Sequence, residues 1–338
     1  MEVYFVLNKF KEVIPYAERL SDIDPENLNL RVKLGILYKD AGSFKKAISS
    51  FEGLLEFAPD NDKILYYLGG IYQEIQNYDK SIEFYGKIKN ESGLYQDSSF
   101  QIAQMLSILA KNEYDNSKEN GPKHQEFVEF IDGMIAKIKA FRVDFSIVKA
   151  AYFESLDEND EAIETLELVQ SDKAFNIDHK FYLATLFEKE EEFNKSTEIV
   201  EKILEDDPKN AHAWNFLGYS LLERNESLDK AHKYIQKAVK LSPNDGYIRD
   251  SLGWYYFKKG DLEQAMNEVM EAVKLVPEDV SVNKHLAVIF SHMKNFKQAK
   301  VYLKKAIQTT SSEAEKAELV EVLKDLNQNR IPANYQLP

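Results

Sequence analysis

The stretch that decides the fold runs from Ala211 to Pro243 and reads AHAWNFLGYSLLERNESLDKAHKYIQKAVKLSP. Leu217 and Leu221 are four residues apart in its first half, which is the spacing of neighbours on one face of a helix. Ala231 and Ile235 repeat this spacing in the second half. The closing proline cannot continue a helix. The stretch therefore predicts two helices joined by a turn.

The following stretch repeats the same pattern in phase. A glycine follows a leucine in both, at Gly218 and then at Gly253, and an alanine opens each second helix, at Ala231 and then at Ala265. Because these residues are small, the backbones of the two helices in a pair can approach closely. One such pair cannot bury its apolar face alone, so the pattern predicts an array of stacked helix pairs.

The small residue of the first helix recurs along the chain with a step of about 34 residues, except for a longer step between Ala103 and Ala150. It is recognisable at Gly35, Gly69, Ala103, Ala150, Ala184, Gly218, Gly253 and Ala287. Counting back from these positions places Met1 at the small-residue position of one more unit, so we expect the chain to begin inside a first helix. The sequence thus predicts about nine helix pairs.

The pattern from Trp214 through Leu217-Gly218 to the closing proline resembles the tetratricopeptide repeat (TPR), with one residue inserted near Asn225. The resemblance implies an all-α fold, an α-α right-handed superhelix of about nine helix-turn-helix repeats plus a C-terminal capping helix. Within that family, NFLGYSL (215–221) and DSLGWYYFKKGDLEQA (250–265) look most like bacterial periplasmic or outer-membrane lipoprotein-type TPR adaptors. That subfamily implies a non-catalytic adaptor for other envelope proteins, including proteases.

We expect three parts: a TPR array over 1–311, a capping helix over 312–326 and a flexible tail over 327–338. The fourth repeat is irregular, because the polar segment 111–124 interrupts it with Gly121-Pro122. This insertion is interpreted as a loop or a helix extension, and either as a tolerated surface insertion or as a docking loop. Ser312 and Glu315 have the spacing of a capping box, which supports the last helix.

Composition limits the classes of partner and of compartment. The 57 acidic residues against 43 basic ones give a formal charge of −14, which disfavours nucleic acid and anionic membranes as partners. The chain has no cysteine, which excludes disulfides and thiolate metal sites. No stretch approaches the roughly 18 apolar residues that a membrane-spanning helix requires. The resemblance implies a periplasmic or outer-membrane-associated location, and a cytoplasmic scaffold is the alternative.

No catalytic motif is present. The sequence lacks a phosphate-binding glycine loop, H-E-x-x-H and G-x-S-x-G. None of the six histidines pairs with another at the spacing of a metal site, so we expect no metal, no cofactor and no enzymatic activity. The alternative is that the array is the non-catalytic region of a larger enzyme. Two charged segments stand out, an acidic one over 154–167 and lysines over 294–305, and both are interpreted mainly as solvated surface.

The resemblance places a binding groove on the first helices of the repeats, at repeat positions 2, 5, 9 and 12. We expect a partner-binding groove formed by His212, Asn215, Tyr219, Leu222, Tyr247, Asp250, Trp254, Phe257, Lys284 and Val288. The aromatic side chains among them are expected to meet in one concave patch and to anchor a protein or peptide partner. The alternatives are that the superhelix itself or a neighbouring chain covers them, and that copies of this chain associate with one another.

Overall fold

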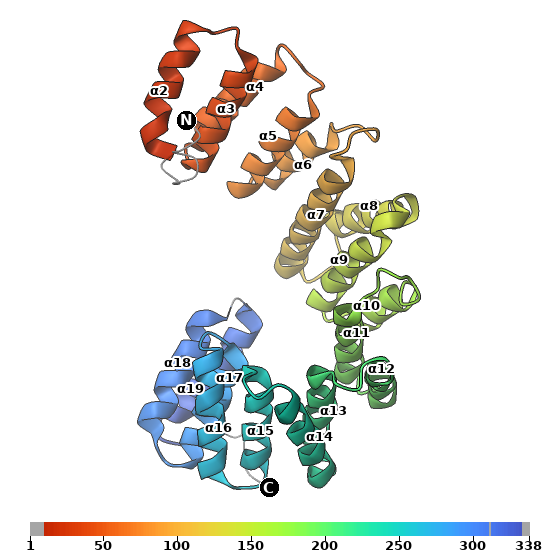
Figure 1. Ribbon diagram of the computed structural model, residues 1–338, viewed down its shortest axis with the longest axis vertical. Helices are drawn as coiled ribbons and strands as arrows, with labels where there is room; N and C mark the ends of the chain where they lie inside the picture. The colour runs from red at the N-terminus through yellow and green to blue at the C-terminus, as the bar shows by residue number, and fades with distance from the viewer. Residues whose placement is uncertain (1–9, 311, 333–338) are drawn as a thin grey trace. The chain divides into compact units, whose positions relative to one another are not determined.

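The computed structural model describes residues 10–310 and 312–332, so Met1 and residues 333–338 of the predicted tail lie outside the described residues. Every regular element in that part of the chain is a helix. The predicted all-α array of helix pairs is therefore confirmed (Figure 1). The chain forms two compact units, 1–179 and 180–338, and the boundary falls within α11 (Ile177–Lys189).

In the first unit, consecutive helices pack in pairs: α3 on α4, α5 on α6, α7 on α8 and α9 on α10. Its elements are α2 (Phe10–Ile23), α3 (Leu28–Asp40), α4 (Phe44–Leu55), α5 (Asp62–Glu74), α6 (Tyr78–Gly86), α7 (Tyr95–Ser117), α8 (Pro122–Lys137), the 3-10 turn η1 (Lys139–Phe141), α9 (Arg142–Ser155) and α10 (Asn159–Glu167).

The second unit continues the same pairing, and α13 packs on α14, α15 on α16 and α17 on α18. Its elements are α12 (Phe193–Asp206), α13 (Ala211–Glu223), α14 (Leu228–Leu241), α15 (Gly246–Lys258), α16 (Leu262–Leu275), α17 (Val280–His292), α18 (Phe296–Thr309) and α19 (Glu313–Asn327). The first helices of successive pairs also touch, because α13 contacts α15 and α15 contacts α17.

Short polar side chains start many of these helices. The side-chain oxygen of each accepts a hydrogen bond from a backbone N–H of the first turn, which otherwise has no partner inside the helix. Asparagine or aspartate does this at Asn27, Asn61, Asn77, Asn210, Asp245, Asp261, Asp279 and Asn295. At α19 the side chain of Ser312 accepts from the N–H of Glu315, at the positions where the sequence predicted a cap.

The two glycines of the repeat lie where helices cross closely. A Cβ atom added at Gly218 would lie 2.6 Å from Cγ1 of Ile235 and 3.0 Å from the carbonyl oxygen of Ala231, both on α14. A Cβ at Gly253 would meet Val269 and the carbonyl oxygen of Ala265 in the same way. The predicted close crossings are confirmed, and any larger residue at these positions would push the two helices apart.

The predicted insertion at 111–124 is mostly helix. The long helix α7 continues through Ser117, Lys118 ends it with a left-handed backbone at φ 61°, and α8 begins at Pro122. Glu113 of α7 holds the two helices together, because its carboxylate accepts a hydrogen bond from the N–H of Lys123 at 2.8 Å. The structure thus favours the helix extension over the loop.

The division into an array over 1–311, a capping helix and a tail stays a prediction. The helix expected over 312–326 is present as α19, which packs on α18 and contributes Leu319, Val322 and Leu326 to the core of the second unit. Each unit has its own set of buried apolar residues.

Candidate functional site

The predicted groove residues of the second unit divide into accessible and buried ones. His212 and Tyr247 are exposed, and Asn215, Tyr219 and Lys284 are half-buried. The remaining five are buried: Leu222, Asp250, Trp254, Phe257 and Val288. These five side chains are thus covered within the second unit, and the assignment of the whole set to a partner-binding groove stays a prediction.

Trp254 is buried because its indole contacts side chains of its own repeat and of the next one. Its indole stacks on the ring of His285 from α17 with centroids 4.1 Å apart, and on Phe257 with centroids 4.6 Å apart. Its Nε1 donates a hydrogen bond to Oε1 of Glu223 at 2.8 Å. The side chain is only 3% exposed as a result. Trp254 therefore joins neighbouring repeats, as the alternative interpretation of the sequence allowed.

A buried polar pair reinforces this junction. Nδ1 of His285 lies 2.7 Å from Oδ2 of Asp250, and both residues are buried. Because hydrogen-bonded polar groups in a core require matched partners, this pair fixes how α15 and α17 pack.

The other predicted residues differ in their surroundings. Tyr219 packs against the core of the second unit, whereas Tyr247 is 53% exposed at the start of α15. Nε2 of His212 lies 3.5 Å from Oδ2 of Asp245, so it contacts the cap of that helix. Their assignment to a partner stays a prediction.

The first unit contains an open groove between α7 and α9, with His179 of α11 at its border and a volume of about 520 Å³. Its floor is apolar and partly accessible, formed by Phe100, Ile108, Ile147, Val148 and Ala151. Ile108 is 40% exposed, so its side chain is accessible from the groove. The groove can therefore take up apolar side chains of another molecule.

Polar groups border this floor. Gln104, Ser107 and Lys111 line the groove from α7, and Asp144 and Ser155 line it from α9. Asp144 is exposed, and its carboxylate forms neither an ion pair nor a hydrogen bond with the described residues. It lies in the first turn of α9, as Asp97 does in the first turn of α7, where the helix dipole favours a carboxylate.

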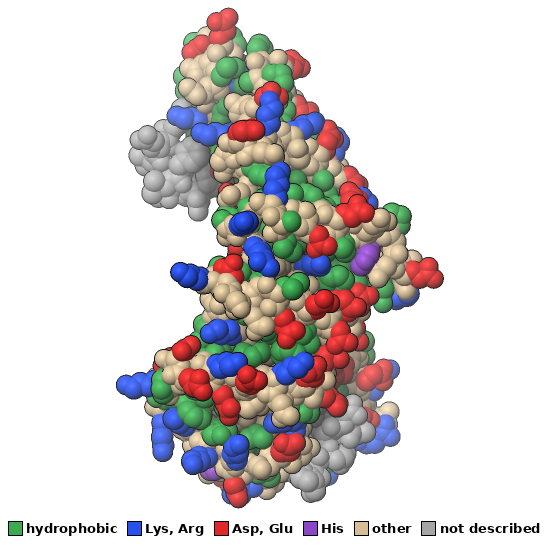
Figure 2. Space-filling view, turned by 90° about the vertical axis from the view of Figure 1, so that its right-hand side faces the viewer, with side chains coloured by type: hydrophobic (Ala, Val, Ile, Leu, Met, Phe, Trp, Pro, Cys, Tyr) green, Lys and Arg blue, Asp and Glu red, His purple; other side chains and the backbone are tan. Residues whose placement is uncertain are grey.

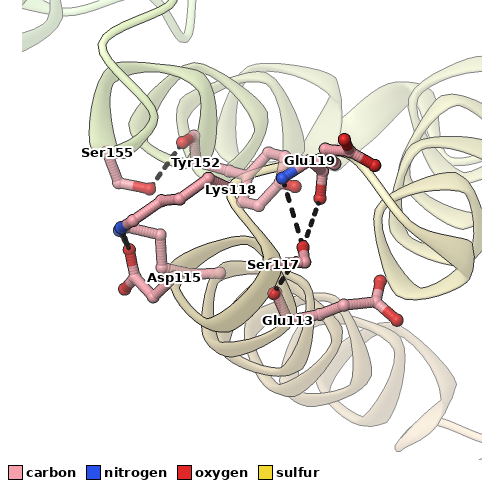
Figure 3. Close-up of polar contacts among 8 residues, drawn as sticks. Glu113, Asp115, Ser117, Lys118, Glu119, Tyr152 and Ser155 are labelled. Atoms are coloured by element: carbon pink, nitrogen blue, oxygen red, sulfur yellow. Dashed lines mark hydrogen bonds and ion pairs between the residues drawn. The ribbon is translucent and has the colours of Figure 1, made fainter.

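The opposite end of the groove is held by local hydrogen bonds. Figure 3 shows the end of α7, where the hydroxyl of Ser117 donates to the backbone and accepts from the N–H of Glu119 at 3.1 Å. Nζ of Lys111 lies 2.6 Å from Oδ1 of Asp115, and the hydrogen bond from Lys111 lowers the pKa of that carboxyl. The hydroxyl of Ser155 donates to the carbonyl of Tyr152 at 2.6 Å. These hydrogen bonds connect side chains to the backbone and to one another near Lys111 and Ser155, which line the groove.

Tyr152 is the most buried residue of the groove wall. Its hydroxyl lies 2.8 Å from Nδ1 of His124, and its ring packs on Phe127 with centroids 4.5 Å apart. Burial, assisted by the nearby carboxylates of Glu158 and Glu113, raises the pKa of Tyr152 to about 12. The phenol therefore stays protonated at neutral pH, and its role is structural, joining α9 to α8.

The repeat pattern of the sequence also points to residues of this groove. Counted from the small residues Ala103 and Ala150, repeat positions 5 and 9 are Phe100 and Gln104 on α7, and Ile147 and Ala151 on α9. The same rule that predicted the second-unit residues thus selects four residues that line the groove.

Neither a metal centre nor a membrane span is found within the described residues. No three His, Asp or Glu side chains there gather closely enough to hold a metal ion. No helix in the described part of the chain is long and apolar enough to cross a bilayer.

Models of the tetratricopeptide repeat match four segments. One model matches residues 32–92, 183–246 and 221–280, and a second matches 285–312, so together they cover more than half of the chain. The chain belongs to the tetratricopeptide repeat family. The matched segments coincide with repeats of both units, and a TPR array of this kind is a protein-interaction scaffold.

Known relatives agree with the repeat. A TPR repeat-containing protein of Pseudomonas aeruginosa, PA4667, is 37% identical over 84 residues, which are 25% of this chain and 14% of the relative. The chain thus matches only a small part of that relative's length. A tetratricopeptide repeat protein from Parabacteroides merdae has a similar fold, with a TM-score of 0.52 at 13% identity, covering 89% of this chain and 99% of that one. A TPR protein of Thermus thermophilus, TTC0263, aligns at a TM-score of 0.46 and 16% identity over 53% of this chain and 97% of its own.

Proposed function

We propose that this TPR scaffold binds a short segment of a partner protein in the groove between α7 and α9, with apolar side chains on its floor and a basic side chain beside Asp144. The observation that carries the proposal is the accessible apolar floor itself, because a groove of about 520 Å³ has room for several side chains. An extended or helical segment with spaced apolar residues fits such a surface.

Charge favours a basic rather than an acidic segment. Asp144 lines the groove without a partner among the described residues, and Asp97 is exposed at the corresponding end of α7. Lys111 on the opposite wall is already paired with Asp115. Acidic side chains also gather on the face shown in Figure 2, and the whole chain carries a formal charge of −14. The unpaired carboxylate of Asp144 and the negative charge of the chain would attract a cationic segment and repel an anionic one.

The setting of that partner is a further proposal. The resemblance of 215–221 and 250–265 to envelope adaptors supports a periplasmic or outer-membrane-associated partner, for which an envelope protease or assembly complex is the predicted class. A cytoplasmic scaffold and the non-catalytic region of a larger enzyme are the competing proposals. The absence of enzymatic activity also stays a prediction.

Replacing Ile108 by aspartate is expected to weaken binding of a basic-apolar peptide by tenfold or more, about 1.4 kcal/mol. The physical reason is that the substitution removes an accessible apolar contact and buries a carboxylate against the ligand. The probes are labelled peptides in which leucine or phenylalanine alternates with lysine, and affinity is measured by fluorescence anisotropy.

Ile75 supplies the matched control, because it is also 40% exposed but lies outside the groove, at the end of α5. Ile75→Asp should bind these peptides as the unmodified chain does. Peptides with glutamate in place of lysine should bind more weakly, and Asp144→Lys should reduce that preference. Equal affinities for Ile108→Asp, Ile75→Asp and the unmodified chain would refute the groove assignment.

A further inference from the structure

Two oppositely charged helix faces, separate from the groove, carry the next inference. In α10 of the first unit, Asp160, Glu161, Glu164 and Glu167 are all exposed, and none of them forms an ion pair with the described residues. Their spacing places them on one face of the helix. We define this set, together with Leu168 at its end, as the acidic face.

The second unit carries the complement on α18. Lys297 and Lys304 are exposed and Lys300 is half-buried, and none of the three pairs with a carboxylate among the described residues. In contrast, Lys305 on the same helix pairs with Glu278 at 3.2 Å. We define the three unpaired lysines and Val301 as the basic face. These residues line a shallow depression of about 420 Å³ together with Asn329.

Each face also exposes one large aliphatic side chain. Leu168 is 70% exposed beside the carboxylates, and Val301 is 56% exposed among the lysines. Arg142 lies beside the acidic face, and its guanidinium donates to the backbone carbonyl of Leu168 at 3.0 Å rather than to a side-chain carboxylate. An apolar centre within charges of one sign is the composition of a contact surface more than of a purely solvated one.

The spacing of the charges matches in an antiparallel arrangement. Along α10 the carboxylates Asp160, Glu164 and Glu167 occupy offsets 0, 4 and 7. Read backwards along α18, Lys304, Lys300 and Lys297 occupy the same offsets. Both rows span about 10 Å at the helical rise of 1.5 Å per residue. Two such helices side by side would bring each carboxylate opposite an ammonium group.

We propose that the acidic face of one molecule docks on the basic face of a second copy of this chain, with α10 antiparallel to α18. Every molecule carries both faces, so the contact is heterologous and leaves one free face of each kind at the ends of a dimer. Further copies can therefore add. The basic face attracts acidic surfaces, and the chain itself is acidic, with a net charge of −14. Its helix α10 carries a row of carboxylates whose length matches the row of lysines.

The proposal predicts an association that depends on concentration and salt. At low ionic strength the weight-average mass should rise above 39.1 kDa as protein concentration increases. It should return toward that value in high salt, because the Debye length falls from about 30 Å at 0.01 M to about 3 Å at 1 M. Sedimentation velocity measures both. A mass that stays at the monomer value at every concentration in low salt would overturn the proposal.

A charge-swap experiment tests the faces directly. The double variants Lys297→Glu/Lys304→Glu and Asp160→Lys/Glu167→Lys should each lose association at least tenfold when studied alone. An equimolar mixture of the two should recover it as heterodimers, because the unmodified acidic face of the first variant meets the unmodified basic face of the second. The control is Lys33→Glu/Lys45→Glu, at exposed lysines of α3 and α4. It changes the net charge by the same amount as Lys297→Glu/Lys304→Glu and should associate normally.

The register is tested by two double variants, each made within one chain, so that every contact between copies carries both changes. Glu167→Lys/Lys297→Glu should associate more strongly than Glu167→Lys/Lys304→Glu, because position 297 of one copy lies opposite position 167 of the next. If the Lys33→Glu/Lys45→Glu control lost as much association, the effect would come from net charge alone, and the proposal would be overturned. The proposal would also be overturned if the basic face bound vesicles of anionic phospholipid while the chain stayed monomeric, because the face would then bind a lipid surface.

Discussion

Replacing Trp254 by alanine is expected to lower the free energy of unfolding of the second unit by about 3–5 kcal/mol. The indole is 3% exposed, stacks on Phe257 and on His285 of the next repeat, and donates a hydrogen bond to Glu223. Its removal leaves a cavity between α15 and α17 and takes a donor from a carboxylate at the same time. Hydrogen exchange measured residue by residue is the suitable readout, because repeat arrays do not always unfold in one step.

Two variants separate this loss from a general effect of changing α15. Trp254→Phe keeps a six-membered ring for stacking but loses the five-membered ring with its hydrogen bond to Glu223, so its effect should be smaller, about 1.5–3 kcal/mol. Tyr247→Ala removes an aromatic side chain that is 53% exposed on the same helix, and should stay within about 0.5 kcal/mol of the unmodified chain. If Trp254→Ala exchanged its amide protons as slowly as the unmodified chain, the indole would not be part of the core.

The sequence predicted the repeat well because its signals are local. The four-residue spacing of Leu217 and Leu221 and the small residue between them depend only on the helix and its partner within one repeat. The same holds for the asparagine and aspartate caps, each of which bonds to N–H groups two or three residues ahead. These features therefore needed no knowledge of which repeats are neighbours.

The groove could be predicted only in part, because accessibility depends on what the next repeat places over a given position. Repeat position 9 is Trp254 on α15 and Gln104 on α7. Position 6 of the first helix in the following repeat is His285 on α17, which stacks on Trp254, and Val148 on α9, which lines the same groove as Gln104. The large rings stack and close the surface, whereas the smaller side chains leave an open groove. Periodicity identifies the face of a helix, and the volumes of facing side chains decide whether that face is accessible.

Replacing Gly218 by valine is expected to destabilise the second unit by about 1–3 kcal/mol through overpacking. A Cβ there would lie 2.6 Å from Cγ1 of Ile235 and 3.0 Å from the carbonyl oxygen of Ala231, closer than carbon atoms normally approach either. The isoleucine side chain can rotate away, but the carbonyl belongs to the backbone of α14 and moves only with that helix. Valine adds two methyl groups to this contact, so α13 and α14 must separate. Denaturant unfolding and hydrogen exchange of α13 and α14 measure the loss.

Gly133→Ala provides the opposite control, because Gly133 lies within α8 and a Cβ there would meet nothing within 4 Å. At that position alanine should stabilise the helix by about 0.5–1 kcal/mol, since glycine loses more backbone freedom on folding. Shortening the facing side chain by Ile235→Ala should reduce the penalty of Gly218→Val without abolishing it, because the carbonyl of Ala231 remains in place. An unchanged unfolding transition for Gly218→Val would mean that the two helices do not cross as closely as the repeat requires. A penalty that Ile235→Ala leaves undiminished would place the clash on the backbone alone.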